Sequence, residues 1–235
     1  MKKQYAGTGQ YQVVLAVLAS CGLGTATSAD PEHKDAPKPL LLEIVKAWRD
    51  AGAQAGWMKD IPAQLGTYKF GEPWREKGEE GAIPAFRFPD KNADGVLAKL
   101  PDPGTAFGLD FHCGFYAGVT LKELAKLKHL QSLCIGGVQG KAYADLEDLA
   151  GMTNLRGLYL FYLPVTDVQL KHLVGLKSLQ ALDLSHTRVT DRGLKEFTGL
   201  RDLQWLNLRC TEVTQAGVAT LQKALPKCKI LTGDD

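Results

Sequence analysis

LKSLQALDLSHTRVTDRGLKEFTG, residues 176–199, is the middle of three consecutive copies of one sequence pattern. The preceding copy is MTNLRGLYLFYLPVTDVQLKHLVG (152–175), and the following one is LRDLQWLNLRCTEVTQAGVATLQK (200–223). Equivalent positions therefore lie 24 residues apart, in the frame L-x-x-L-x-x-L-x-L-x-x-T/L-x-V-T-x-x-x-L. A fixed period of this length predicts a stack of strand-plus-helix units.

This frame resembles leucine-rich repeats of the ribonuclease-inhibitor and cysteine-containing types, and most closely those of short secreted proteins of planctomycete-like bacteria. The resemblance covers Phe107 to Ile230. It implies an α/β fold, a short horseshoe solenoid of about five strand-helix repeats, preceded by a helical or irregular cap. It also implies that the concave face of the horseshoe is the binding surface.

The core-facing leucines predict five strands. These strands are centred on Leu109/Phe111, Leu133/Ile135, Leu158/Leu160, Leu182/Leu184 and Leu206/Leu208. One repeat buries about six apolar side chains at roughly 2 kcal/mol each, which does not offset ~1–2 kcal/mol of backbone entropy for every residue. The repeats must therefore stack to fold.

A turn between strand and helix recurs as Thr187–Asp191, with the sequence TRVTD. Thr190 is expected to cap the helix that follows, and Asp191 adds a favourable charge near its N-terminus. Thr166, Asp167 and Thr214 repeat the signal. These acids are therefore expected to be structural and not catalytic.

Four segments organise the chain. Residues 1–29 read as a signal peptide, 30–38 as a proline-bearing tether, 39–105 as an N-terminal cap region and 106–235 as the repeat domain. In the cap, apolar residues at helical spacing predict an amphipathic helix over 39–51, and GEEGAIPAFRF (78–88) predicts a turn and a short strand. Residues 90–95 resemble the front half of a calcium loop, but Pro101 occupies the position of the bidentate Glu, which favours a polar turn.

The first 29 residues predict export. Lys2 and Lys3 precede a short apolar run at 13–19, which is too short to span a bilayer. The sequence LASC before Gly22 fits a bacterial lipobox with Cys21 as the lipidated residue, whereas Thr27-Ser28-Ala29 fits an ordinary cleavage site. We expect a periplasmic, outer-membrane or cell-surface protein held by a lipid anchor, with plain secretion as the alternative.

The charge balance argues against a nucleic-acid partner. All 26 acidic residues lie after residue 29, together with 28 − 2 = 26 basic residues, so the mature chain is close to neutral. Binding of phosphates requires a basic face. The sequence therefore predicts no nucleic-acid partner, and the resemblance to leucine-rich repeats implies a protein partner.

Side chains alternate faces along a strand, so the residues between the core leucines point to the concave face. Aromatic and arginine side chains dominate contact hot spots, and aspartates orient polar partners. The predicted partner-binding residues are Asp110, Tyr159, Phe161, Asp183, Trp205, Asn207 and Arg209.

No catalytic, metal or cofactor motif is recognisable. The sequence lacks a nucleophile elbow, an HExxH motif and a phosphate loop. His129 and His172 both lie in KHL sequences, interpreted as equivalent solvated positions, and the spacing of Cys113, Cys134, Cys210 and Cys228 predicts no disulfide. We therefore expect a non-enzymatic protein-interaction module; a structural envelope protein and a site hidden in 53–103 remain the alternatives.

Overall fold

The computed structural model describes residues 40–59, 74–75, 81–88, 96–111, 121–136 and 146–233. Its helices, with η marking 3₁₀ turns, are α2 (Leu42–Asp50), η1 (Leu97–Lys99), α3 (Leu121–Leu124), η3 (Glu147–Leu149), α4 (Asp167–Leu170), η4 (Lys171–Leu173), α5 (Asp191–Leu194), η5 (Lys195–Phe197) and α6 (Gln215–Ala224). Its strands are β1 (Gln54–Met58), β2 (Trp74–Arg75), β3 (Ile83–Arg87), β4 (Phe107–Asp110), β5 (Leu130–Cys134), β6 (Gly157–Tyr159), β7 (Ala181–Asp183), β8 (Trp205–Asn207) and β9 (Lys229–Leu231).

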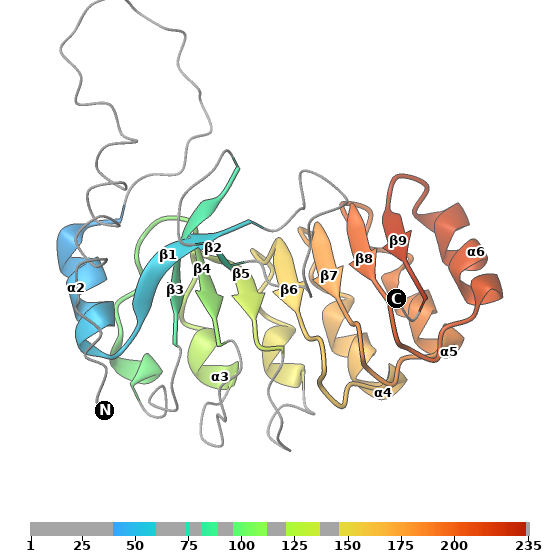
Figure 1. Cartoon of the computed structure of the whole chain (residues 1–235), viewed down its shortest axis with the longest axis horizontal. Helices are drawn as coiled ribbons and strands as arrows, with labels where there is room; N and C mark the ends of the chain where they lie inside the picture. Colours follow the sequence, from blue (N-terminus) through green and yellow to red (C-terminus); the bar gives the residue numbers. More distant parts are fainter. Residues whose placement is uncertain are drawn as a thin grey trace, which may run out of the picture.

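All nine strands form one sheet in the order β2-β1-β3-β4-β5-β6-β7-β8-β9, which runs across the molecule (Figure 1). The strands from β3 to β9 are parallel, and β1 is antiparallel to both of its neighbours. From Leu158, each step along the sheet joins residues 24 apart, through Leu182 and Leu206 to Ile230. The fold is an α/β leucine-rich-repeat solenoid, as the sequence predicts.

The five predicted strands are present as β4 to β8. A sixth repeat strand, β9, follows them and was not predicted. Its Ile230 lies 24 residues after Leu206, and Cys228, just before the strand, is 4 % exposed. β9 was overlooked because its three residues, KIL, carry little of the leucine pattern.

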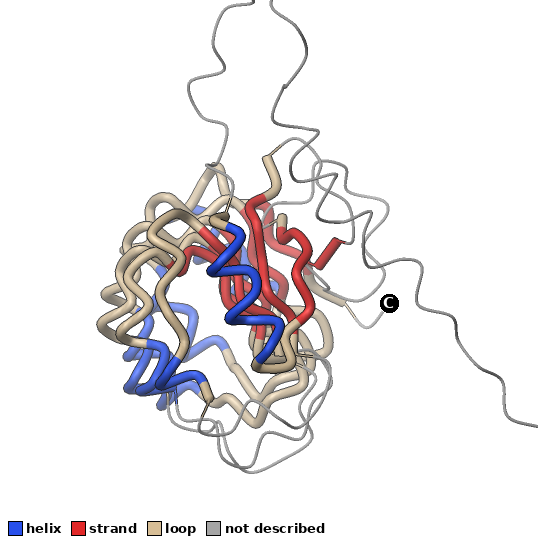
Figure 2. Tube along the Cα trace, turned by 90° about the vertical axis from the view of Figure 1, so that its left-hand side faces the viewer, coloured by secondary structure: helices blue, strands red, loops and turns tan. Residues whose placement is uncertain are grey.

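Each repeat closes with a short helical segment on the side of the coil opposite the strand (Figure 2). The leucines of the strands and of these segments form one continuous buried core. Leu158, Leu170, Leu182 and Leu206 are within it, with 0 % of their surface exposed. Stacking therefore buries the apolar side of every turn, as the energy balance of a single repeat requires.

The helix expected over 39–51 is present as α2, and it lies across the first turn of the coil (Figure 2). Its Trp48 is fully buried, stacks on Phe86 of β3 with ring centroids 4.4 Å apart, and meets Phe107 of β4 edge-on. The Trp48 indole N–H also donates to the carbonyl oxygen of Pro101 at 3.0 Å. The short strand expected within 78–88 is β3, which continues the sheet into the first repeat.

The predicted helix caps are confirmed in the last two repeats. Thr190 Oγ1 accepts a hydrogen bond from the Arg192 N–H, and Thr214 Oγ1 accepts one from the Gly217 N–H. At Thr166 the partner is different: Gln169 Oε1 accepts from both the N–H and the hydroxyl of Thr166, at 3.0 and 2.5 Å. Gln169 therefore ties Thr166 within its own repeat.

The predicted signal peptide, Cys21, the tether and the turn at 90–95 lie outside the described residues. Within the described ranges, none of the helices has the length and apolar character needed to cross a membrane.

Candidate functional site

The sheet brings all seven predicted partner-binding residues onto one face. Two rows cross the strands on the side opposite the leucine core. The first contains Gly108, Ser132, Gly157, Ala181 and Trp205, and the second contains Arg87, Asp110, Cys134, Tyr159, Asp183 and Asn207. Phe161 and Arg209 lie two residues beyond the second row. His112, on the same alternation, lies outside the described residues.

Most of these side chains are buried, whereas simple alternation predicts that they are exposed. Asp110, Tyr159 and Asp183 are 0 % exposed, Phe161 is 5 % and Trp205 is 3 %. Asn207 is also buried, and Arg209 is half-buried. The sequence pattern thus places the residues on the correct face but overestimates their accessibility.

One reason for the burial is that large side chains lie flat over small ones on the same face. A Cβ atom at Gly136 would lie 2.5 Å from the Phe161 ring, and one at Gly108 would lie 2.5 Å from the Met58 sulfur. The rings of Tyr159 and Trp205, with centroids 6.5 Å apart, belong to the same buried cluster as Ala181. This second apolar cluster, on the concave side, contains Met58, Ala85, Cys134, Tyr159, Phe161, Ala181 and Trp205.

At the N-terminal end of the face, Arg87 and Asp110 form a buried ion pair. Arg87 Nε and Nη2 each lie 2.7 Å from Asp110 Oδ2. Cys134 is the neighbour of Asp110 on the next strand. Burial, together with the charge of Asp110, raises the pKa of the Cys134 thiol well above its ordinary value. The raised pKa disfavours the thiolate, which is the nucleophilic form of cysteine.

Towards the C-terminal end, Asp183 is the centre of a buried polar group. Its Oδ1 accepts hydrogen bonds from the N–H and hydroxyl of Ser185, at 2.8 and 2.6 Å, and its Oδ2 accepts one from the Asn207 amide at 3.0 Å. Burial raises the pKa of Asp183 above its ordinary value, while the hydrogen bonds from Ser185 and Asn207 oppose that shift. Both oxygens of the Asp183 carboxylate thus accept hydrogen bonds from neighbouring residues.

The accessible part of this surface is its rim, formed by the residues that follow β6, β7 and β8. Tyr162, His186 and Cys210 lie 24 residues apart and have positive φ angles of 60°, 55° and 52°. Tyr162 is 49 % exposed, and its ring stacks on the His186 imidazole with centroids 4.0 Å apart. We define the rim as Tyr162, His186, Arg209 and Cys210. Of these four residues the sequence predicted only Arg209; Tyr162, His186 and Cys210 were missed, although they share one position of the frame.

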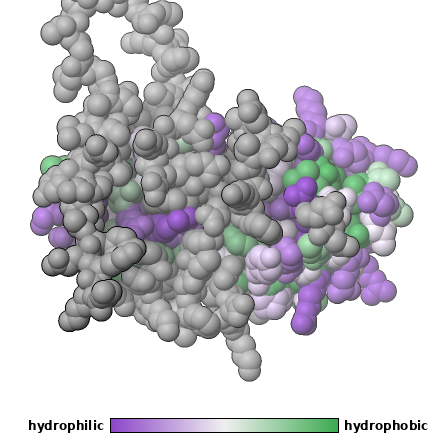
Figure 3. All heavy atoms as spheres, viewed as in Figure 1, coloured by the Kyte–Doolittle hydropathy of each residue, from purple (hydrophilic) through white to green (hydrophobic). Residues whose placement is uncertain are grey.

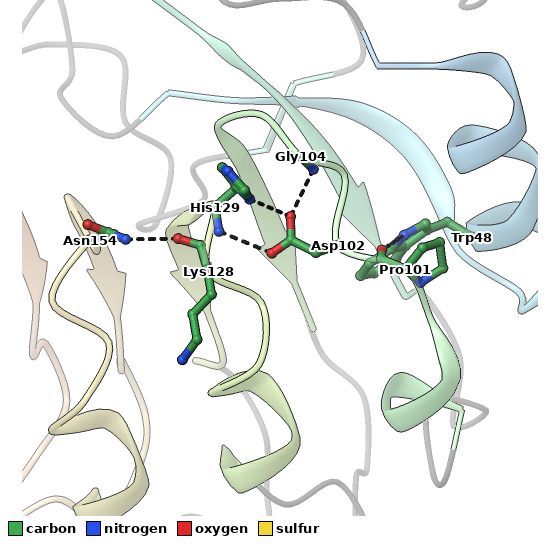
Figure 4. A network of polar contacts seen from close by, with 7 residues as sticks. All are labelled: Trp48, Pro101, Asp102, Gly104, Lys128, His129 and Asn154. Atoms are coloured by element: carbon green, nitrogen blue, oxygen red, sulfur yellow. Dashed lines mark hydrogen bonds and ion pairs between the residues drawn. The ribbon is translucent and has the colours of Figure 1, made fainter.

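His129 belongs to a different network, between the cap and the second repeat (Figure 4). Its Nδ1 lies 2.7 Å from Asp102 Oδ1, and its backbone N–H donates to Asp102 Oδ2. Partial burial alone would raise the pKa of Asp102, but hydrogen bonds from Gly104 and His129 lower it overall. The interpretation of His129 and His172 as equivalent positions is wrong: His129 precedes β5, whereas His172 lies in η4.

The described cysteines Cys134, Cys210 and Cys228 carry free thiols, and Cys113 lies outside the described residues. No group of three or more His, Cys, Asp or Glu side chains able to hold a metal ion occurs in the described part of the chain. The arrangement of aromatic rings, amides and one accessible arginine is therefore suited to recognition, because it pairs apolar contact area with hydrogen-bond donors.

A scan against protein-family models gives no match, and a search of the curated proteins gives none either. Among solved structures, the chain is similar to internalin C2 of Listeria monocytogenes, with 23 % identity, a TM-score of 0.45 and coverage of 55 % of this chain and 54 % of that one. It is also similar to an internalin, InlF, of the same organism (22 % identity, TM-score 0.44, 59 % and 36 % covered). A third similar structure is a leucine-rich repeat protein of Leptospira interrogans, with 23 % identity, a TM-score of 0.38 and coverage of 54 % of this chain and 29 % of that one. The matches thus span about half or less of each of these proteins.

Proposed function

We propose that this chain is a non-enzymatic protein-interaction module that holds its partner on the concave side of the repeats. One observation carries the proposal: a rim of accessible aromatic and cationic groups stands on a rigid sheet. Tyr162 and His186 present their stacked rings, and Arg209 is half-buried beside them. Tyrosine and arginine are enriched at interface hot spots.

The seven predicted residues have two roles in this proposal. Arg209 contacts the partner directly. The buried side chains position the rim from below: Phe161 meets Tyr162 edge-on with centroids 6.2 Å apart, and Asn207 Oδ1 accepts the backbone N–H of Arg209. Tyr159, Trp205, Asp110 and Asp183 fix the face through the contacts described above. A preorganised surface loses less conformational entropy on binding.

We further propose that the module works in the cell envelope. The basic start, the short apolar run and the LASC sequence support export and lipid attachment at Cys21. Stable membrane attachment requires more than one acyl chain, and the bacterial lipoprotein modification supplies them. The intact mass of the mature protein tests this step, because a plain N-terminus at Asp30 contradicts lipidation.

The main test is a crosslinking capture from the source envelope, followed by mass spectrometry. The rim variant carries Tyr162→Ala, His186→Ala and Arg209→Ala. The matched control carries Val168→Ala, Lys171→Ala and Lys195→Ala, which remove three exposed side chains from the helical side. Loss of one partner with the rim variant alone supports the proposal, provided circular dichroism shows both variants folded. Equal capture by both variants contradicts it.

The burial of the concave face favours a second candidate, a structural envelope protein without a specific ligand. Six of the seven predicted residues offer little surface to a partner. In that case neither parent nor variant retains a specific protein after crosslinking.

A further inference from the structure

Two arginines lie on the concave side, and they differ in their partners. Arg87 is paired with Asp110, as described. Arg209, near the other end of the sheet, has no ion pair within the described residues. Its Nε is buried and has no hydrogen-bond partner there.

Asp183, on the neighbouring strand β7, already accepts hydrogen bonds from other residues. Asp183 is bonded to Ser185 and to the Asn207 amide, and the Asn207 carbonyl oxygen accepts the backbone N–H of Arg209 at 3.2 Å. The local network therefore fixes the main chain of Arg209 but leaves its guanidinium group without a counter-charge in the described structure.

Gly233 lies beside Cys210, the residue that follows Arg209. The Cys210 N–H donates to the carbonyl oxygen of Gly233, which brings Gly233 alongside. A Cβ atom on Gly233 would meet no atom within 4 Å. Leu231, half-buried, packs against the concave apolar cluster from the same strand end. Hydrophobic and hydrophilic surfaces alternate in this C-terminal part of the molecule (Figure 3).

A half-buried guanidinium has lost part of its hydration, and a carboxylate can restore it with two parallel hydrogen bonds. We propose that Arg209 is the binding site for a carboxylate of the partner protein, an acidic side chain flanked by apolar residues in an extended segment. The apolar flank contacts Leu231. This inference rests on the proposed function, and it names the chemistry of the partner.

The test uses two peptides that differ in one group, Ac-Leu-Glu-Leu-NH₂ and Ac-Leu-Gln-Leu-NH₂, titrated into the full chain. The readouts are the NMR signal of the Arg209 Nε–H and the dissociation constant. We expect the Glu peptide to shift the Nε signal and to bind roughly tenfold more tightly than the Gln peptide, since the Gln peptide lacks the charge. Equal binding of the two peptides, or no binding of either, overturns the inference.

Variants distinguish the contribution of Arg209 to binding from that of the overall charge of the protein. Arg209→Gln removes the preference for the Glu peptide, and Arg209→Lys retains part of it. Arg188→Gln, which removes an exposed arginine of the preceding repeat, leaves the preference unchanged. A preference that survives Arg209→Gln overturns the inference. The inference is also overturned if deletion of Asp234 and Asp235 shifts the Nε signal. Such a shift would mean that the chain's own carboxylates bind Arg209 in the parent protein.

The capture experiment described above distinguishes this inference from the proposed function. If Arg209→Gln alone leaves capture intact while Tyr162→Ala with His186→Ala abolishes it, the interaction module stands and the carboxylate inference fails.

Discussion

Asp167 accepts two hydrogen bonds from Thr190 of the next repeat, 2.9 Å from the backbone N–H to Oδ1 and 2.7 Å from the hydroxyl to Oδ2. Twenty-four residues later, Asp191 accepts the same two bonds from Thr214, at 2.8 and 2.6 Å. The acid at the start of one helix therefore holds the cap of the next helix. The sequence predicts a structural role for these acids within their own helix, whereas their hydrogen bonds join neighbouring repeats.

Asp167→Ala is expected to destabilise the protein by about 1–2 kcal/mol, because both donors of Thr190 lose their acceptor. In a double-mutant cycle with Thr190→Val, the coupling energy should be about 1 kcal/mol. Urea unfolding of the four proteins measures both values. Strict additivity would show that the bond from the Thr190 hydroxyl to Asp167 does not join the repeats.

The close approach of Asp167 requires a glycine in the next helix. A Cβ atom on Gly193 would lie 2.4 Å from Asp167 Oδ1 and 2.6 Å from Leu170 Cδ1. Gly193→Ala is therefore expected to cost about 1–3 kcal/mol by overpacking, although alanine is the better helix former. Gly151→Ala is the control, since a Cβ there meets no atom within 4 Å, and it should be neutral or slightly stabilising. Equal effects in thermal unfolding would contradict the steric argument.

The Asp191 joint should weaken at low pH. Hydrogen bonds from the Thr214 hydroxyl and N–H lower the pKa of Asp191 below its ordinary value of 3.8. The stabilisation is therefore fully present above that value and is lost as the pH falls through the lower, folded-state pKa. Urea midpoints of the parent and Asp191→Asn, measured from pH 6 to pH 2, should converge below about pH 4. Asp148→Asn, at an exposed site in η3, controls for general charge. A difference that stays constant over this range argues against a role for ionised Asp191.

The thiols should differ in reactivity. Burial raises the pKa of Cys228 to about 12, so about one thiol in ten thousand is ionised at pH 8. Cys134 is also buried, with a raised pKa, whereas Cys210 is partly exposed. Among these three described cysteines, iodoacetamide labelling followed by peptide mapping should therefore modify Cys210 first, and all three should react in guanidinium chloride. Rapid labelling of Cys228 in the folded protein would contradict this.

The regular part of the fold can be predicted from the sequence because the leucine positions follow from a period. Leu158, Leu182 and Leu206 recur at a constant spacing, and a strand needs only alternation to place them in the core. The caps Thr190 and Thr214 follow from the same frame. β9 can be predicted in the same way, since Ile230 continues the series.

The candidate site is harder to predict because it depends on lateral packing. Alternation places Phe161 on the concave side, but it does not reveal that the ring packs against Gly136, which follows the neighbouring strand β5. Likewise, the stacking of Tyr162 on His186 depends on a left-handed backbone that non-glycine residues seldom adopt. The pairing of Asp102 with His129 joins residues 27 apart and off the 24-residue frame, so no periodic argument finds it.

The sequence shows where the series of Asp-to-Thr hydrogen bonds begins and ends. Gln169 supplies Thr166 with an acceptor from its own repeat, and Gln215 stands where Asp167 and Asp191 stand in the two earlier helices. Of the three 24-residue copies, only 176–199 carries both halves of the joint: Asp191 for the next copy, and Thr190 with Gly193 for the previous one. A second copy of residues 176–199 inserted after the first would therefore find the same acid, threonine and glycine at each new contact between repeats. Within the described residues, the Asp-to-Thr joints are thus confined to the three copies from 152 to 223, whereas the leucine core continues on both sides of them.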